Sequence, residues 1–251
     1  MLRLWDARTG SYAVLASFSV PLRVCVHGPA DGAWSGLADL RVLLVADVLT
    51  RIAELQGMET ITVLAAGGPP PAGLGEDLAA VGIHPPAALA SYREARAMLG
   101  GSAQVHVARH APGSGHGGDG VLIGVGPVED VTQRAAGRNR RDLLALRLAL
   151  LSCPYREPVR LTQAALADAA VLAGRWRRRM AEWAGQPSKP IPAEAASVIR
   201  GAFDDDLDTV AAVDLLRSVE ARPDVPAGAK FETFLFVDRV LGLELPREVG
   251  L

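Results

Sequence analysis

Apolar residues in the first quarter of the chain follow two spacings that predict a strand, a helix and a second strand. Leu22–His27 reads Leu-Arg-Val-Cys-Val-His, a β-branched run that ends at Gly28-Pro29. Aliphatic residues then recur every three or four positions from Leu37 to Leu55, and the pattern stops at Gly57. Residues 60–64 form a second short apolar run. This order is typical of a βαβ unit, so we expect the two runs to pair as parallel strands.

The pattern changes near residue 140. Residues 104–108 and 121–125 predict two more strands, and no strand pattern follows them. Helical spacing then covers four segments, namely residues 143–152, 162–184, 193–202 and 209–221. The sequence therefore predicts an α/β protein: a Rossmann-like parallel-sheet domain over residues 1–138, of the nucleotide-binding type, followed by an all-α helical bundle over residues 139–251.

Composition narrows the functional classes. The chain has 251 residues, of which 49% are hydrophobic and 22% charged, which excludes wholesale disorder. Its 26 basic and 28 acidic residues give a net charge of −2, so no global basic field favours nucleic acid. Two cysteines cannot form a disulfide framework or a cysteine-only zinc site. Charges follow Met1 closely and every apolar run is short, so we expect a cytoplasmic protein without a signal peptide or membrane segment.

Three glycines follow the first predicted strand, at the place where doubly wound folds bind phosphate groups. Gly28, Gly32 and Gly36 are spaced by four residues, and no Lys-Ser or Lys-Thr pair comes after them. This is neither the dinucleotide fingerprint nor a P-loop, so a nicotinamide cofactor is disfavoured. The turn either lines a ligand site or serves only to reverse the chain.

Other polar residues have both a structural and a functional interpretation. His27 ends the first strand, at the edge where parallel sheets hold ligands, while His106 and His110 flank a later strand end. None of them has a helical spacing suited to zinc. The aspartates within residues 204–208 precede a helix, which favours capping over metal binding. The arginines within residues 175–179 form either a solvated helix face or a phosphate-binding surface.

Several short motifs occur in a characteristic order. The chain opens Leu2-Arg-Leu-Trp-Asp-Ala-Arg-Thr, continues with His27-Gly-Pro and Asp47-Val-Leu, and carries His116-Gly-Gly before Leu122-Ile. This series resembles cysteinyl-tRNA synthetase and its relative, the cysteine:glucosaminyl-inositol ligase of mycothiol synthesis. The resemblance implies a class I synthetase fold that lacks the large connective insertion. It also implies a ligand site at one sheet edge, made of His27, Gly28, Pro29, Asp39, Arg41, His116, Gly117 and Gly118.

The chain departs from this family at its catalytic signatures. Gly36-Leu37-Ala38-Asp39 stands where the family has His-Ile-Gly-His, and the Lys-Met-Ser-Lys-Ser loop is absent. Of the family's zinc ligands, the first Cys falls on His27, the His on Gly126 and the Glu on Asp130, while the segment with the second Cys is missing. The resemblance therefore implies no tightly bound zinc and names no catalytic residue.

These observations leave three functional hypotheses. The first is a shortened, degenerate synthetase-like paralogue that acts by binding an amino acid, a nucleotide such as ATP, or a protein partner. The second is an ATP-dependent ligase that joins cysteine or a related amino acid to a small amine through a remodelled site. The third is a tRNA-binding module that uses residues 175–179. None of the three involves a membrane.

Overall fold

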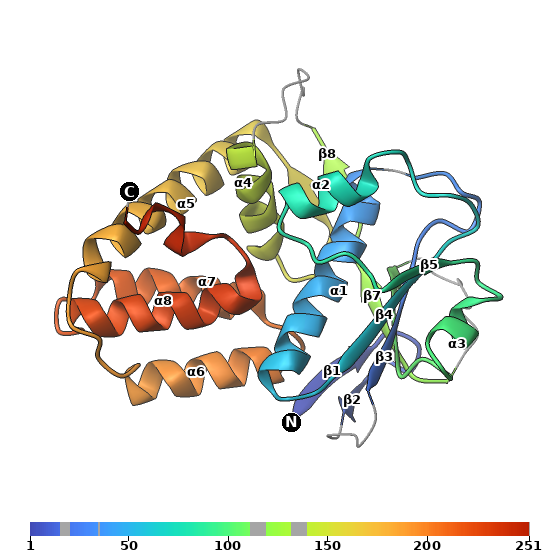
Figure 1. Ribbon diagram of the computed structural model, residues 1–251, viewed down its shortest axis with the longest axis horizontal. Helices are drawn as coiled ribbons and strands as arrows, with labels where there is room; N and C mark the ends of the chain where they lie inside the picture. The colour runs from blue at the N-terminus through green and yellow to red at the C-terminus, as the bar shows by residue number, and fades with distance from the viewer. Residues whose placement is uncertain (16–20, 35, 111–118, 132–139, 251) are drawn as a thin grey trace. The chain divides into compact units, whose positions relative to one another are not determined.

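The computed structural model describes residues 1–15, 21–34, 36–110, 119–131 and 140–250. They form two compact units (Figure 1). The first unit is Met1–Asp130 together with Tyr155–Arg160, and the second is Val131–Pro154 together with Leu161–Leu251. The chain thus leaves the first unit, returns to it for six residues and leaves again. Our sequence-based division, with a single boundary between residues 138 and 139, does not include this return to the first unit.

A five-stranded sheet organises the first unit, with strand order β5-β4-β3-β6-β7 and all neighbours parallel. The strands are β3 (Leu22–His27), β4 (Thr60–Ala65), β5 (Ala88–Ala90), β6 (Val105–Arg109) and β7 (Val121–Val125). At the centre of the sheet, Cys25 of β3 is paired with Val63 on one side and His106 on the other. The predicted α/β class, and the parallel pairing of the first two strands, are confirmed.

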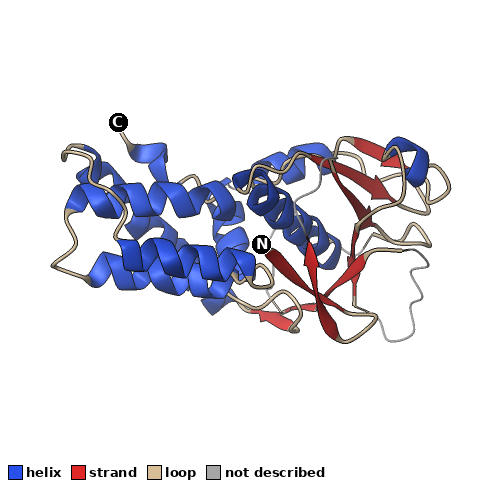
Figure 2. Ribbon diagram, turned by 90° about the horizontal axis from the view of Figure 1, so that it is seen from below, coloured by secondary structure: helices blue, strands red, loops and turns tan. Residues whose placement is uncertain are grey.

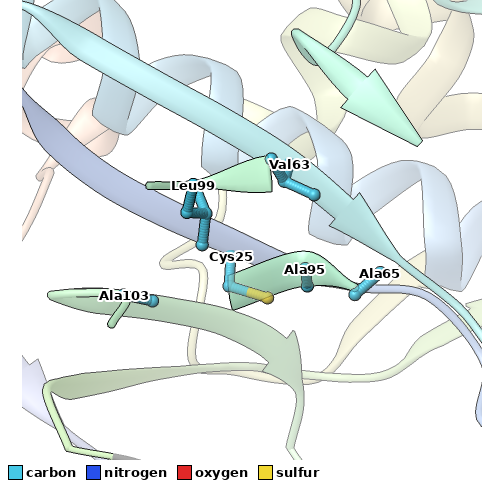
Figure 3. Close-up of a cluster of buried hydrophobic side chains, with 6 residues drawn as sticks. All are labelled: Cys25, Val63, Ala65, Ala95, Leu99 and Ala103. Atoms are coloured by element: carbon cyan, nitrogen blue, oxygen red, sulfur yellow. The ribbon is translucent and has the colours of Figure 1, made fainter. Parts of the chain in front are cut away.

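Helices cover both faces of this sheet, which is why its strands are apolar almost throughout. Figure 1 shows α1 (Leu37–Leu55) on one side and α3 (Ala95–Met98) on the other, while α2 (Leu74–Ala80) follows β4. Val24 and Val26 of β3 are fully buried on the α1 side. The opposite face carries a small-residue core beneath α3 (Figure 3), formed by Cys25, Val63, Ala65, Ala95, Leu99 and Ala103.

A hairpin that the sequence pattern did not predict precedes the sheet. It consists of β1 (Leu2–Asp6) and β2 (Ser11–Leu15), paired antiparallel. The Asp6 carboxylate accepts a hydrogen bond from the Leu122 N–H at 3.1 Å, and the Ala7 N–H donates to the Leu122 carbonyl at 2.8 Å. The end of the hairpin is therefore fastened to β7. Two short strands, β8 (Val128–Asp130) and β9 (Val159–Leu161), form a separate two-stranded sheet.

The second unit is helical, as predicted, and Figure 2 shows its described part as helices joined by loops. Its helices are α4 (Arg140–Leu151), α5 (Gln163–Ala184), α6 (Ala193–Asp204), α7 (Thr209–Ala221), α8 (Ala227–Leu241) and a short 3-10 helix, η1 (Leu245–Glu248). Asp208 caps α7 by accepting from the Ala211 N–H at 2.9 Å, which confirms the capping interpretation of this acidic segment. None of the helices among the described residues is long and apolar enough to cross a membrane.

A buried arginine fastens the start of α1 to two other parts of the first unit. Arg41 is only 1% exposed. Its Nη1 donates to the carbonyls of Gly126 at 2.9 Å and Glu157 at 2.6 Å. An ideal Cβ on Gly126 would lie 2.3 Å from the same Glu157 oxygen, so only glycine fits at this turn. Through these contacts Arg41 holds the turn after β7 and the returning segment Tyr155–Arg160 together.

The loops after β3 and β4 approach each other at backbone distance. The Gly28 N–H donates to the Ala65 carbonyl at 2.8 Å, and the Gly67 N–H donates to the Pro29 carbonyl at 3.0 Å. A Cβ on Gly67 would lie 1.7 Å from the carbonyl oxygen of Ala30. The two loops therefore fit together only because residue 67 has no side chain.

We predict that Gly67→Ala lowers the free energy of unfolding by about 1–3 kcal/mol or more, because the new methyl group must push the two loops apart. Urea denaturation measures the loss. Gly75→Ala is the matched control, because Gly75 lies in α2 and an ideal Cβ there meets nothing within 4 Å. That change should stabilise the protein by about 0.5–1 kcal/mol through helix propensity. Equal effects of the two substitutions would contradict the close approach.

We further predict that Arg41→Met lowers the free energy of unfolding by about 2–4 kcal/mol, because the carbonyls of Gly126 and Glu157 lose a charged donor in a buried place. Arg93→Met is the control, since Arg93 is exposed, and it should stay within about 0.5 kcal/mol of the parent. Urea denaturation of the three proteins gives the comparison. If the two variants lose the same stability, Arg41 does not hold the junction.

Candidate functional site

Two histidines meet beside the carboxyl end of the central strand β3. His27 is the last residue of β3, and His106 lies on the neighbouring strand β6. The Nε2 of His27 is 2.9 Å from the Nδ1 of His106, and the ring centroids are 5.2 Å apart. His27 is 9% exposed, while His106 is half-buried. The carboxyl ends of parallel strands are where doubly wound folds bind ligands, so His27 marks the centre of the candidate site, and His106 reaches it from nearer the amino end of β6.

The hydrogen bonds fix the tautomers of the pair. The Nε2 of His106 lies 3.1 Å from the carbonyl oxygen of Asp119, which can only accept. In the neutral ring, Nε2 therefore carries the hydrogen and Nδ1 accepts. It follows that the Nε2–H of His27 donates to His106, and that the Nδ1 of a neutral His27 bears a lone pair. The two rings form an oriented chain of donors that ends at Asp119.

Two aromatic side chains enclose the turn that follows His27. The Tyr92 ring stacks on His27, with centroids 5.6 Å apart and planes inclined by 24°. Its hydroxyl donates to the Gly28 carbonyl at 2.6 Å, and burial raises the pKa of Tyr92. A Cβ on Gly28 would lie 3.1 Å from the Trp34 ring, so the backbone there packs tightly against the indole. The His27 ring is thereby held in one orientation.

Cys25 joins the histidines on the same face of the sheet. One ligand atom from each of Cys25, His27 and His106 lies within 4.8 Å of the others. Burial raises the pKa of the Cys25 thiol to about 11, so the thiol is protonated at neutral pH. Sequence reasoning placed His27 in the site, noted His106 only as flanking a later strand end, and gave Cys25 no role in the site. The alternation of Cys25 and His27 on one strand was visible, but the register that sets His106 beside Cys25 was not.

An ion pair with a buried carboxylate stands at the beginning of α1. Asp39, in the first turn, is 4% exposed and accepts from the Arg109 Nε at 2.9 Å, and the Arg109 Nη2 donates to the same oxygen. Arg109 is the last residue of β6 and its side chain is 38% exposed. The carboxylate is favoured at this place by the helix dipole as well as by the guanidinium. Where the resembled family has an imidazole, this chain therefore has an acid with its own counter-ion.

The remaining residues predicted for the site are placed differently. Pro29 and Gly28 belong to the turn after β3, beside the histidines. Arg41 is buried with the backbone carbonyls described above, away from solvent. His116, Gly117 and Gly118 lie outside the described residues. The site as a whole therefore stays a prediction, centred on His27, Gly28 and Asp39.

The zinc ligand set of the resembled family does not fit this chain. Gly126, at the position of the family's histidine, has no side chain, and Asp130, at the position of the glutamate, is exposed on β8. Of the family's zinc-ligand positions, only that of His27 holds a side chain with a ligand atom in the described part of the candidate site. Any metal chemistry here would need a different set of side chains.

Most arginines of the basic stretch on α5 have acceptors within their own unit. Arg175 forms an ion pair with Glu220 at 2.9 Å, and Arg179 forms one with Glu182 at 2.8 Å. Arg177 is buried and donates to the Leu243 carbonyl at 2.7 Å. These contacts make the stretch part of the packing of the helical unit. Binding of tRNA by this segment stays a prediction.

Comparison with known proteins supports the fold. No protein-family model and no curated protein matches the chain. Among solved structures, it is similar to a Campylobacter jejuni protein provisionally named an arginyl-tRNA synthetase, with a TM-score of 0.53 and 10% sequence identity. The match covers 91% of this chain and 90% of the other. At this identity the likeness concerns the fold alone, and the chain has an aminoacyl-tRNA synthetase-like fold.

Proposed function

We propose that this chain is a binding or accessory protein that uses a synthetase-like fold without forming aminoacyl adenylates. The observation that carries the proposal is the Asp39–Arg109 ion pair at the start of α1. Adenylate formation develops negative charge on the α-phosphate and on the departing pyrophosphate. An enzyme of the resembled family meets that charge with preorganised imidazoles and lysines. In this chain the equivalent position is Asp39, which is itself negatively charged.

The electrostatics of this place oppose a second anion. Asp39 is buried, so its charge is weakly screened by solvent, and its carboxylate occupies the favourable end of the helix dipole. Arg109 directs both Nε and Nη2 to that carboxylate rather than to an incoming phosphate. A triphosphate bound here would have to separate the pair, which leaves a buried carboxylate without its partner.

The strand ends beside this pair support binding of a small ligand. Tyr92, which is 38% exposed, presents its ring in front of the nearly buried His27, beside the backbone around Gly28. A ring in this place suits planar or polar groups such as a nucleobase or the side chain and amino group of an amino acid. We therefore propose a ligand of nucleotide or aminoacyl type.

A live ATP-dependent ligase is the second candidate. It is favoured by one observation, the partial exposure of the Arg109 side chain, which is 38%. An ATP-bound state in which Arg109 turned from Asp39 to a phosphate would supply one cation. That enzyme would activate cysteine or a related amino acid for transfer to a small amine.

We expect no useful exchange of pyrophosphate into ATP with cysteine or with a panel of other amino acids. Loss of one electrostatic contact costs about 10²–10³ in rate, and both family sets are absent here. Isotope exchange measures the activity. Turnover of about one per second, a common enzymatic rate, that falls on Arg109→Gln but not on Arg160→Gln would establish the ligase instead. Arg160 is an exposed arginine whose side chain is 68% exposed.

The proposal that the protein binds a small ligand is tested by thermal shift with ATP, cysteine and cysteinyl-sulfamoyl adenosine. At least one of the three should raise the melting temperature. Tyr92→Ala should abolish the shift, because Tyr92 covers the His27 ring. Tyr12→Ala is the control, since Tyr12 lies on the hairpin strand β2. No stabilisation by any of the three compounds would contradict a small-molecule site of this type.

A further inference from the structure

We propose that Cys25, His27 and His106 form a binding site for one thiophilic d10 cation, Zn(II) or Cu(I). The three side chains come from the two central strands of the sheet and bring their ligand atoms within 4.8 Å of one another. This inference goes beyond the proposed function and does not depend on it. It also departs from our sequence-based expectation of no zinc, which followed the ligand positions of the resembled family.

The distances are close to those of a metal site. Zinc lies about 2.3 Å from a cysteine sulfur and about 2.0–2.1 Å from a histidine nitrogen. A sulfur and a nitrogen bound to one ion are therefore at most about 4.4 Å apart. The three ligand atoms lie within 4.8 Å of one another, so they must move closer together to bind an ion. The imidazoles stand closer, with 2.9 Å between His27 Nε2 and His106 Nδ1. Small side-chain rotations would exchange this hydrogen bond for two metal bonds.

The groups around the two histidines orient the rings as the neighbours of metal-binding histidines do. His106 donates its Nε2–H to the Asp119 carbonyl, which leaves Nδ1 with the lone pair directed at the cluster. Metal-binding histidines are commonly oriented by such a hydrogen bond from the second ring nitrogen. Tyr92 stacks on His27 and holds the second ring. His106 is thus oriented as a ligand before any ion arrives, and His27 becomes one once the proton that it donates to His106 moves from Nε2 to Nδ1.

The donor set selects the class of ion. One sulfur and two imidazole nitrogens are soft or borderline ligands, which suit Zn(II) and Cu(I) and are poor ligands for Mg²⁺ or Ca²⁺. Cys25 binds as the thiolate, so its proton leaves to solvent, while each imidazole keeps one N–H. Three protein ligands complete a trigonal Cu(I) site, whereas Zn(II) would take a water molecule as its fourth ligand. His106 is half-buried, which gives an ion a path from solvent.

Cobalt(II) titration of the metal-free, reduced protein tests the site directly. Co(II) is a spectroscopic substitute for Zn(II), and a thiolate ligand produces a sulfur-to-cobalt charge-transfer band. We expect this band to saturate at one Co(II) per chain and to be displaced by Zn(II). Mg²⁺ should have no effect. Competition with a Cu(I) chelator under anaerobic conditions then shows which of the two d10 ions binds more tightly.

Variants assign the ligands. Cys25→Ser should remove the charge-transfer band, and His106→Gln should weaken binding at least about 10-fold, the lower range for loss of a metal-orienting group. Cys153→Ser and His84→Gln are matched controls, because they alter a cysteine and a histidine that lie outside the cluster. Both should bind like the parent. Circular dichroism confirms that each variant is folded. Absence of the band, its survival in Cys25→Ser, or its loss in Cys153→Ser would each overturn the site.

Discussion

The buried guanidinium of Arg41 is the constraint on which the first unit depends. An arginine stays charged in a protein interior, so burying it requires acceptors for its donors. Arg41 takes them from the backbone, at Gly126 and Glu157. Because Arg41 lies in α1, its contacts set the beginning of that helix relative to the end of β7 and to the returning segment. Nothing in this arrangement requires a ligand.

The chemistry of the strand ends follows from where α1 begins. Two residues before Arg41, Asp39 reaches Arg109 at the end of β6, so one ion pair links the helix to the sheet. The adjacent strand β3 ends in His27, whose ring meets His106 instead of a charged group. This edge of the sheet therefore has two neighbouring parts. One is the Asp39–Arg109 ion pair, and the other is the pair of imidazoles with the Cys25 thiol.

The extent to which the sequence predicted this structure differs between elements. Strands β3, β4, β6 and β7 and helix α1 were predicted because each is a short apolar run bounded by turns or has clear helical spacing. Strands β8 and β9, with three residues each, were not predicted. Strand β5 has only three residues, too few to show a period. Helix α8 was missed because apolar residues such as Leu235 also lie on its exposed side, so the sequence does not show one apolar stripe although the buried residues share a face.

The candidate site was predicted from the sequence less completely than the fold. His27 could be found, because it ends a strand that the pattern predicts. Its partners could not, since their approach depends on the register of β3 with β6 and on the path of the loop that carries Tyr92. The Asp39–Arg109 pair was also missed: the acid was noticed only as a departure from a motif, and its counter-ion comes from a strand 70 positions away.

The fastening of the β1–β2 hairpin has a consequence for the behaviour of the sheet in a crowded solution. Outer strands expose unpaired backbone groups that can recruit a strand from another molecule. At Leu122 of β7, these groups are already taken by the Asp6 carboxylate and the Ala7 N–H. The opposite border, β5, offers only three residues for pairing. Both borders of the sheet are thus poor templates for strand addition, which protects an almost wholly apolar sheet from aggregation.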